Sequence, residues 1–194
     1  KAETGEAWSG SDVSRAQPTR RRPRESGSAT YGLSVDRRLG AFSAALGLSW
    51  MAEDRTLLGG RFHDSFGLMG ADTVFLEAQA GWEPGADWRF GAAVRHGQTR
   101  ARDGGQVAPG SQLASTAWSL DVRRRGVFAA ADSVAARISQ PLRAENGVLN
   151  LMLPSGYSYE TLLADYGIRS LSLAPTGREL LGEIAWQGPL LGGQ

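Results

Sequence analysis

The chain has 194 residues with 21 basic and 20 acidic side chains, so its net charge of +1 gives no reason to expect nucleic acid as the main partner. The lack of cysteine excludes disulfides, zinc fingers, iron–sulfur clusters and cysteine nucleophiles. The longest unbroken apolar run, 127–131, is far shorter than the ~20 residues of a membrane helix. Strands of a membrane β-barrel need no such run, so that class stays open.

The first 28 residues differ in composition from the rest of the chain. They contain almost no large apolar side chain apart from Trp8 and Val13, and they carry six basic and four acidic groups. Such a segment cannot bury enough apolar surface to offset the conformational entropy that it would lose on ordering. The arginine cluster at 20–24 fits either an anion-binding patch or a solvated linker. We predict a linker over 1–28 and one β-rich domain over 29–194.

From residue 29 onward, apolar and polar side chains alternate with a period of two, as they do when successive side chains point to opposite faces of a strand. The alternation predicts strands over 30–37, 41–51, 73–83, 87–95, 113–124, 133–142, 148–154, 166–174 and 179–187. Short turns separate them, among them 83–86, 102–105 and 145–147, and 159–166 is expected to be one helical turn or a loop. The predicted fold class is all-β, an antiparallel meander of about nine or ten strands.

A meander of alternating strands is either a soluble barrel with its apolar side inward or a membrane barrel with its apolar side outward. The polar positions carry charges of both signs, which suit a wet lumen and equally suit an ordinary solvated face. On the membrane alternative, the following charges face the lumen: Glu77, Arg89, Arg95, Asp121, Arg123, Arg137, Glu179 and Glu183.

Two further features favour the membrane barrel. Several tryptophans share the apolar positions and lie mostly near strand ends, as expected of an interfacial aromatic girdle: Trp50, Trp82, Trp88, Trp118 and Trp186. Alternating stretches of 10 to 12 residues match the ~9–11 residues of a tilted membrane strand better than the ~5–6 of a soluble one. The alternative is a soluble antiparallel barrel or sandwich that binds an apolar ligand or a protein partner.

The segments 33–62, 117–128, 137–154 and 170–186 resemble the C-terminal part of subtilisin-family autotransporter serine peptidases of Gram-negative, sphingomonad-type bacteria. The most specific pieces are Gln140-Pro141-Leu142-Arg143 and the stretch LAPTGRE at 173–179. The resemblance covers about residues 29–190. It implies an outer-membrane barrel, usually of twelve strands, that acts as the translocator and anchor in type V secretion.

The same resemblance implies partners and a location. The barrel would contact outer-membrane lipid, its own N-terminal passenger and the machinery that assembles outer-membrane barrels, and residues 1–28 would join the passenger to the barrel, inside the lumen or outside it. The chain departs from the family pattern because it stops at Gln194 without a last strand ending in an aromatic residue, and because its strands number fewer than twelve. We therefore expect a barrel that is incomplete at its C-terminus.

Catalysis by this chain is not expected, because the implied peptidase activity would lie in the passenger. Only His63 and His96 could act as general bases, and the contiguous side chains of 63–65 diverge along the backbone. The sequence has no Gly-x-Ser-x-Gly elbow, no phosphate-binding Gly-rich loop and no His-Glu-x-x-His helix. A single carboxylate at Asp103 falls short of a calcium site. We predict no catalytic, cofactor-binding or metal-binding residue.

Overall fold

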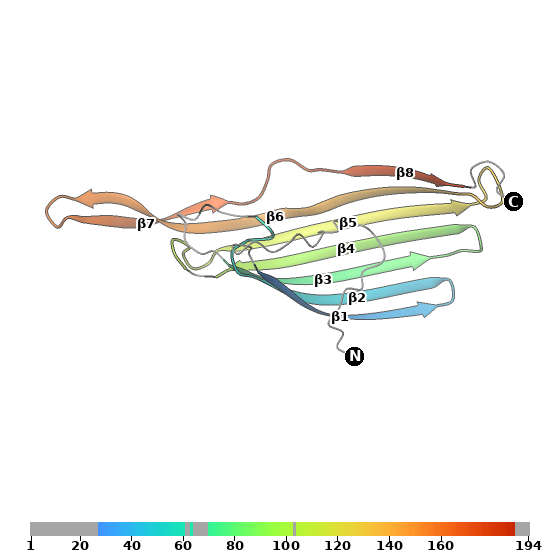
Figure 1. Cartoon of the computed structure of the whole chain (residues 1–194), viewed down its shortest axis with the longest axis horizontal. Coiled ribbons are helices and arrows are strands. Elements are labelled where there is room, and N and C mark those ends of the chain that lie inside the picture. Colours follow the sequence, from blue (N-terminus) through green and yellow to red (C-terminus); the bar gives the residue numbers. More distant parts are fainter. Residues whose placement is uncertain (1–26, 61–62, 64–69, 103, 189–194) are drawn as a thin grey trace.

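The computed structural model describes residues 27–60, 63, 70–102 and 104–188, which form one antiparallel sheet and contain no helix (Figure 1). No helix long and apolar enough to cross a membrane is therefore found among them. The strands are β1 Ser28–Leu39, β2 Phe42–Glu53, β3 Ala71–Trp82, β4 Trp88–Ala101, β5 Gln112–Arg125, β6 Ser133–Ser158, β7 Leu163–Ser172 and β8 Leu181–Gln187. The predicted linker lies outside the described residues except for its last two, and Ser28 already opens β1.

The strands form a meander, because each of β1 to β6 pairs with the next strand along the chain, and β8 pairs with β6. The predicted all-β antiparallel meander is therefore confirmed. The sheet is not closed within the described residues. β1 lies at one edge, and β7 and β8 lie at the other (Figure 1).

One long strand replaces two predicted ones. β6 runs unbroken over 26 residues, so the predicted turn at 145–147 is wrong, and the described residues form eight strands where nine or ten were expected. Asn146 and Gly147 instead pair with Ala114 and Leu113 of β5. A Cβ at Gly147 would lie 2.6 Å from Leu113 Cδ1, so this glycine permits the close approach of a neighbouring strand and does not mark a turn.

β7 and β8 together make one edge strand with a gap. β7 pairs with the distal half of β6 from Val148 onward, and β8 pairs with the start of β6, up to Ser139. Between these two ladders, residues 140–147 of β6 lie opposite residues 173–180. The two segments have the same number of residues, so the register of β7 with β6 continues into that of β8 with β6. Counted with β7 and β8 as one, the sheet has seven strands, and its two edge strands run in the same direction.

Short connections join the strands at one end of the sheet, which we call the turn end. They are 40–41, 83–87 and 126–132. Gly40 has the positive φ, 59°, that a two-residue hairpin loop requires. The turn predicted over 83–86 is confirmed at this end.

Longer connections, 54–70 and 102–111, join the strands at the opposite end, which we call the loop end. The hairpin of β6 and β7 also projects beyond the other strands there (Figure 1). Its turn occupies 159–162, so the loop predicted over 159–166 is shorter than expected and its last residues belong to β7.

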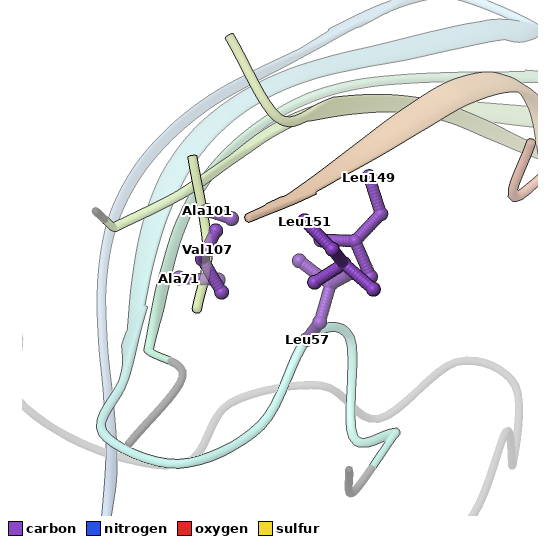
Figure 2. Close-up of a cluster of buried hydrophobic side chains, with 6 residues drawn as sticks. All are labelled: Leu57, Ala71, Ala101, Val107, Leu149 and Leu151. Carbon is purple, nitrogen blue, oxygen red and sulfur yellow. The ribbon is translucent and has the colours of Figure 1, made fainter. Parts of the chain in front are cut away.

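The register gives the sheet two faces. Leu48, Leu76 and His96 form one row across the apolar face, whereas Phe75 and Glu77 lie on the opposite, polar face. A buried hydrophobic cluster nevertheless sits on the polar face at the loop end, where the strands bend around it (Figure 2). Its members come from three strands and two loops: Leu57, Ala71, Ala101, Val107, Leu149 and Leu151.

Candidate functional site

The apolar face carries large hydrophobic side chains that the described part of the chain leaves uncovered. The following are between 47% and 84% exposed: Leu46, Leu76, Val94, Leu120 and Ile184. Paired residues continue this surface from strand to strand, as in the row formed by Val35, Leu46 and Ala78. An exposed apolar surface of this extent marks a contact with lipid, with a ligand or with another protein.

Stacked aromatic rings border the apolar face at both ends. At the turn end, Trp82 stacks between Phe42 and Phe90, with ring centroids 5.9 and 5.5 Å away. At the loop end, Tyr31 stacks on Trp50 with centroids 5.8 Å apart. Two of the predicted girdle tryptophans, Trp50 and Trp82, therefore lie at opposite ends of the apolar face.

The other three predicted girdle residues differ in position. Trp88 is the first residue of β4, at the turn end, and the guanidinium of Arg124 lies 5.2 Å from its ring centroid. Trp186 lies near the turn end of β8, where its Nε1 donates to Asp132 Oδ2 at 3.2 Å. Trp118 lies in the middle of β5, so the expectation of a place near a strand end does not hold for it.

The boundary of the apolar face toward the loop end runs obliquely across the strands. On β3 the apolar positions extend to Val74, but its partner on β4 is the polar Gln98. On β5 they extend to Trp118, whose partner on β6 is Gln140. Arg37 is a charged exception on edge strand β1, close to the turn end.

The polar face collects most of the charges predicted for a lumen. The register places these seven on it: Glu77, Arg89, Arg95, Asp121, Arg123, Arg137 and Glu183. Some of them face an opposite charge, since Arg137 lies between Asp121 and Glu183 in the register, whereas Arg89 faces Arg123. Glu179 belongs to the gap segment 173–180 before β8 begins, so strand pairing does not assign it to either face.

Glu77 and Arg95 form a charge pair on the polar face. Arg95 Nε lies 3.0 Å from Glu77 Oε1, and its guanidinium sits 3.8 Å from the centroid of the Phe75 ring. Phe75 in turn covers Gly97, where a Cβ would approach the ring to 2.6 Å. A glycine opposite an aromatic residue thus lets the ring and the charge pair stack in one layer.

A polar hollow of about 380 Å³ lies on this face between the charge pair and the turn end. Gly91 opens it, because a Cβ there would collide with the carboxylate of Asp121. Arg137 Nη2 donates to Ser119 Oγ at 3.2 Å, while its Nε finds no hydrogen-bond acceptor among the described residues. The side chains that line the hollow include Arg38, Gln79, Arg89, Asp121 and Arg137.

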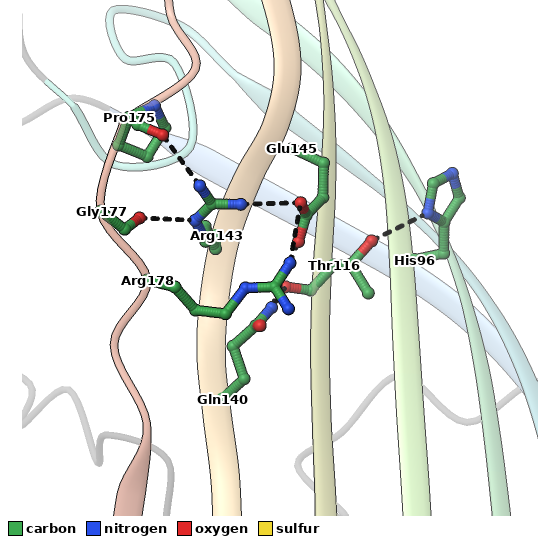
Figure 3. Close-up of polar contacts among 8 residues, drawn as sticks. All are labelled: His96, Thr116, Gln140, Arg143, Glu145, Pro175, Gly177 and Arg178. Atoms are coloured by element: carbon green, nitrogen blue, oxygen red, sulfur yellow. Dashed lines mark hydrogen bonds and ion pairs between the residues drawn. The ribbon is translucent and has the colours of Figure 1, made fainter.

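Arg143 bridges the gap between β7 and β8 (Figure 3). Its Nη2 donates to Pro175 O at 2.8 Å and its Nε donates to Gly177 O at 3.0 Å, so one side chain satisfies two carbonyls of the gap segment. Its Nη1 donates to Glu145 Oε2 at 2.7 Å, and Arg178 lies 3.7 Å from the same oxygen. These contacts hold the gap segment beside β6 without ladder pairing.

The two sequence pieces that carry the family resemblance, 140–143 and 173–179, face each other at this gap. Gln140 also donates to the Thr116 carbonyl at 3.3 Å, next to irregular pairing of β5 with β6 (Figure 3). Sequence reasoning did not single out Arg143 as a functional or structural residue. The only signal for it was its place in the first of these two pieces.

The histidines weighed as general bases lie apart in the chain. His96 sits on the apolar face, with Nδ1 3.3 Å from Thr116 Oγ1 (Figure 3). Its Nε2 lies 3.0 Å from Gln98 Nε2. His63 lies in the long connection at the loop end, and Asp103 lies outside the described residues. In the part of the chain that the structure describes, no cluster of three or more His, Asp or Glu side chains could hold a metal ion.

Asp132 organises the last connection at the turn end. Its Oδ1 accepts from Val127 N at 2.7 Å, and its Oδ2 accepts from Phe128 N at 2.9 Å and from Trp186 Nε1. Desolvation raises the pKa of this carboxyl group, but the hydrogen bonds from Trp186 and the backbone outweigh it, and the pKa lies below its ordinary value.

Comparison with protein-family models, with curated proteins and with solved structures finds no match to this chain.

Proposed function

We propose that the chain forms part of the wall of an outer-membrane β-barrel, the translocator and anchor of a type V autotransporter. The apolar face then contacts lipid, and the polar face lines the lumen. The observation that carries the proposal is the exposed apolar face with aromatic stacks at both of its ends. Full burial of one Leu or Ile side chain is worth roughly 1.5–3 kcal/mol, so a fold that leaves many of them in water forgoes much of its stabilisation.

The side on which the loops fold supports this orientation. In a soluble barrel the apolar face would be the enclosed one. Here the loop residues Leu57 and Val107 instead pack against the polar face, the side toward which the strands bend (Figure 2). An apolar face on the outer side of the bend is what a lipid-facing wall requires.

The oblique boundary of the apolar face supports a tilted wall. Strands of membrane barrels tilt by roughly 35–45°, so a lipid layer of constant height crosses them diagonally. The apolar positions give way to polar ones at Gln98 on β4 and at Gln140 on β6, and these two positions follow such a diagonal. Arg37, near the turn end, has a side chain long enough to reach the interface.

The unequal ends support a sidedness for the wall. Outer-membrane barrels have short turns on the periplasmic side and longer loops on the outer side. We assign the turn end of this sheet to the periplasm and the loop end, with its projecting hairpin, to the cell exterior.

Completion of the wall requires further strands. Bacterial outer-membrane barrels have an even number of antiparallel strands. β1 and the β7–β8 edge run in the same direction, so closing the sheet directly would place two parallel strands side by side. A second copy of the chain, related by rotation about the barrel axis, would also place parallel strands side by side where the two copies meet. An odd number of additional strands, from outside the described residues, would complete an antiparallel wall.

The role in secretion comes from the family resemblance of the two pieces that meet at the β7–β8 gap. The proposed partners are outer-membrane lipid, an N-terminal passenger and the machinery that assembles outer-membrane barrels. Any peptidase activity would belong to the passenger, and we assign no covalent chemistry to this chain.

One observation favours the alternative of a binding module. A shallow hollow of about 1150 Å³ crosses the apolar face near the turn end, where Phe42, Trp82 and Leu120 line it. In a soluble protein such a hollow would hold an apolar ligand or a partner's apolar side chains.

Purification of the full chain with and without detergent tests the proposal. We expect a folded monomer only in detergent or lipid, and a band on a denaturing gel that shifts after boiling. A folded monomer in plain buffer that binds an apolar dye would contradict the proposal and support the binding module.

A further inference from the structure

The polar face is divided into a sealed half and an open half. Toward the loop end, Thr73 and Phe75 on β3 and Thr99 on β4 are at most 2% exposed. Toward the turn end, Ala93 of β4 is partly exposed, and it lines the polar hollow. The stacked layer of Phe75 with the Arg95 guanidinium separates the two halves.

Two loop segments, 54–60 and 104–111, pack against the polar face at the loop end, next to the sealed half. Leu57 and Val107 insert into the hydrophobic cluster from these segments (Figure 2). The second segment also pairs with the distal half of β6, because Val107 bridges Leu151 and Met152 N donates to the Gln106 carbonyl at 2.7 Å. Both side chains and backbone therefore fix the loops against the sheet.

A buried carboxylate fixes the first segment. Glu53, only 3% exposed, accepts from Thr56 Oγ1 at 2.6 Å and from the backbone N–H groups of Leu58 and Gly59 at 2.8 Å each. Hydrogen bonds to a charged group are stronger than neutral ones. Residues 56–59 are thus held in the fold that presents Leu57 to the cluster.

We infer that segments 54–60 and 104–111 form a plug that closes the polar face at the loop end and leaves it open at the turn end. This inference rests on the proposed function, in which the polar face lines the path of an exported polypeptide. A polypeptide in transit would need the surface that Leu57 and Val107 occupy. Passage and the docked plug therefore exclude each other, and the plug closes the path when no chain is passing.

The lack of native cysteine permits a direct test by thiol labelling of the full chain, folded in detergent. Ala93→Cys and Thr99→Cys place single thiols on the same strand and the same face, one in each half. We expect a water-soluble maleimide to label Thr99→Cys on the order of 100-fold more slowly than Ala93→Cys, because reaction requires local opening. In denaturant the two thiols should react at equal rates.

A second variant removes the plug contacts. Leu57→Ser combined with Val107→Ser should raise the labelling rate of Thr99→Cys at least about tenfold and leave that of Ala93→Cys unchanged. Loss of the heat-dependent gel shift would show that the double variant does not fold. The milder Glu53→Gln then replaces it, and we expect a smaller rise in the labelling rate of Thr99→Cys. Equal labelling of the two thiols in the native loop background, or no rise in a folded plug variant, would overturn the inference.

Failure of the plug and failure of the proposed function give different results. The labelling rates are measured in micelles and do not depend on insertion into a bilayer. A detergent-dependent protein with equally labelled thiols refutes the plug alone, whereas a detergent-independent folded monomer refutes the membrane wall.

Discussion

Neighbouring residues of β4 illustrate how differently the two faces of the sheet are used. Ala92 lies in an apolar surface that extends over all the strands, with Ala80 and Leu120 as its partners. Ala93 lies between the rows of Arg89 and Arg95, in a hollow lined by charges of both signs. On the polar face, several charges are paired and two loop segments pack against the far end. The apolar face has no partner in the described chain, and under the proposed function its partner is lipid.

The largest expected effect sharpens the contrast between covered and uncovered apolar residues. Leu149 is 1% exposed in the cluster under the plug, whereas its pairing partner Leu171 is 52% exposed. Leu149→Ala should lower the free energy of unfolding in detergent by about 2–5 kcal/mol, because it leaves a cavity. Leu171→Ala should change it by less than about 1 kcal/mol. Equal effects in a denaturant titration would show that the cluster is not a core.

The next effect compares the two faces directly with one pair of substitutions. Ala92→Arg should lower the free energy of unfolding in phospholipid vesicles by about 2–4 kcal/mol, because it places a charge against lipid. Ala93→Arg, one residue away, should cost less than about 1 kcal/mol in a wet hollow. If Ala93→Arg proves the more costly, the assignment of faces is reversed.

A smaller effect concerns the edge of the sheet. Arg143→Met removes three hydrogen bonds at the β7–β8 gap and should cost roughly 1–2 kcal/mol, with faster hydrogen exchange in β8. Arg178→Met, which loses only an exposed 3.7 Å ion pair, should cost ~0–1 kcal/mol. Unchanged exchange in β8 for the Arg143→Met protein would show that the gap is held by other contacts.

The smallest effect depends on pH. Because the pKa of Asp132 is lowered in the folded protein, its carboxylate stabilises the fold above the unfolded-state pKa of ~3.9, and this contribution is lost as the pH falls through the lower folded pKa. Asp132→Asn should therefore be less stable than the native protein at pH 7 and approach it in acid. A stability difference that stays constant from pH 7 to pH 2 would contradict this assignment.

The period of two in the sequence was sufficient to predict the meander and the membership of the two faces, because alternation is a local property of each strand. Gly147 shows where local reasoning failed. Its sequence context predicts a turn, yet its lack of a side chain serves the approach of Leu113 from a strand far away in sequence. Strand pairing over long sequence distances decides such cases.

The plug and the gap could not be predicted for a related reason. Leu57 and Val107 lie in connections without periodicity, so nothing in their neighbourhood marks them as core residues. Arg143 contacts carbonyls more than thirty residues later in the chain. Both features depend on which segments the folded sheet brings together.

Quenching by brominated lipid tests the central claim, that the apolar face contacts lipid, most directly. A variant that keeps Trp82 alone is compared in vesicles with a variant that has only Gln79→Trp, on the polar face of the same strand. We predict strong quenching of Trp82 by lipids brominated on their acyl chains and weak quenching of the tryptophan at position 79. Equal quenching, or stronger quenching at position 79, would contradict the account.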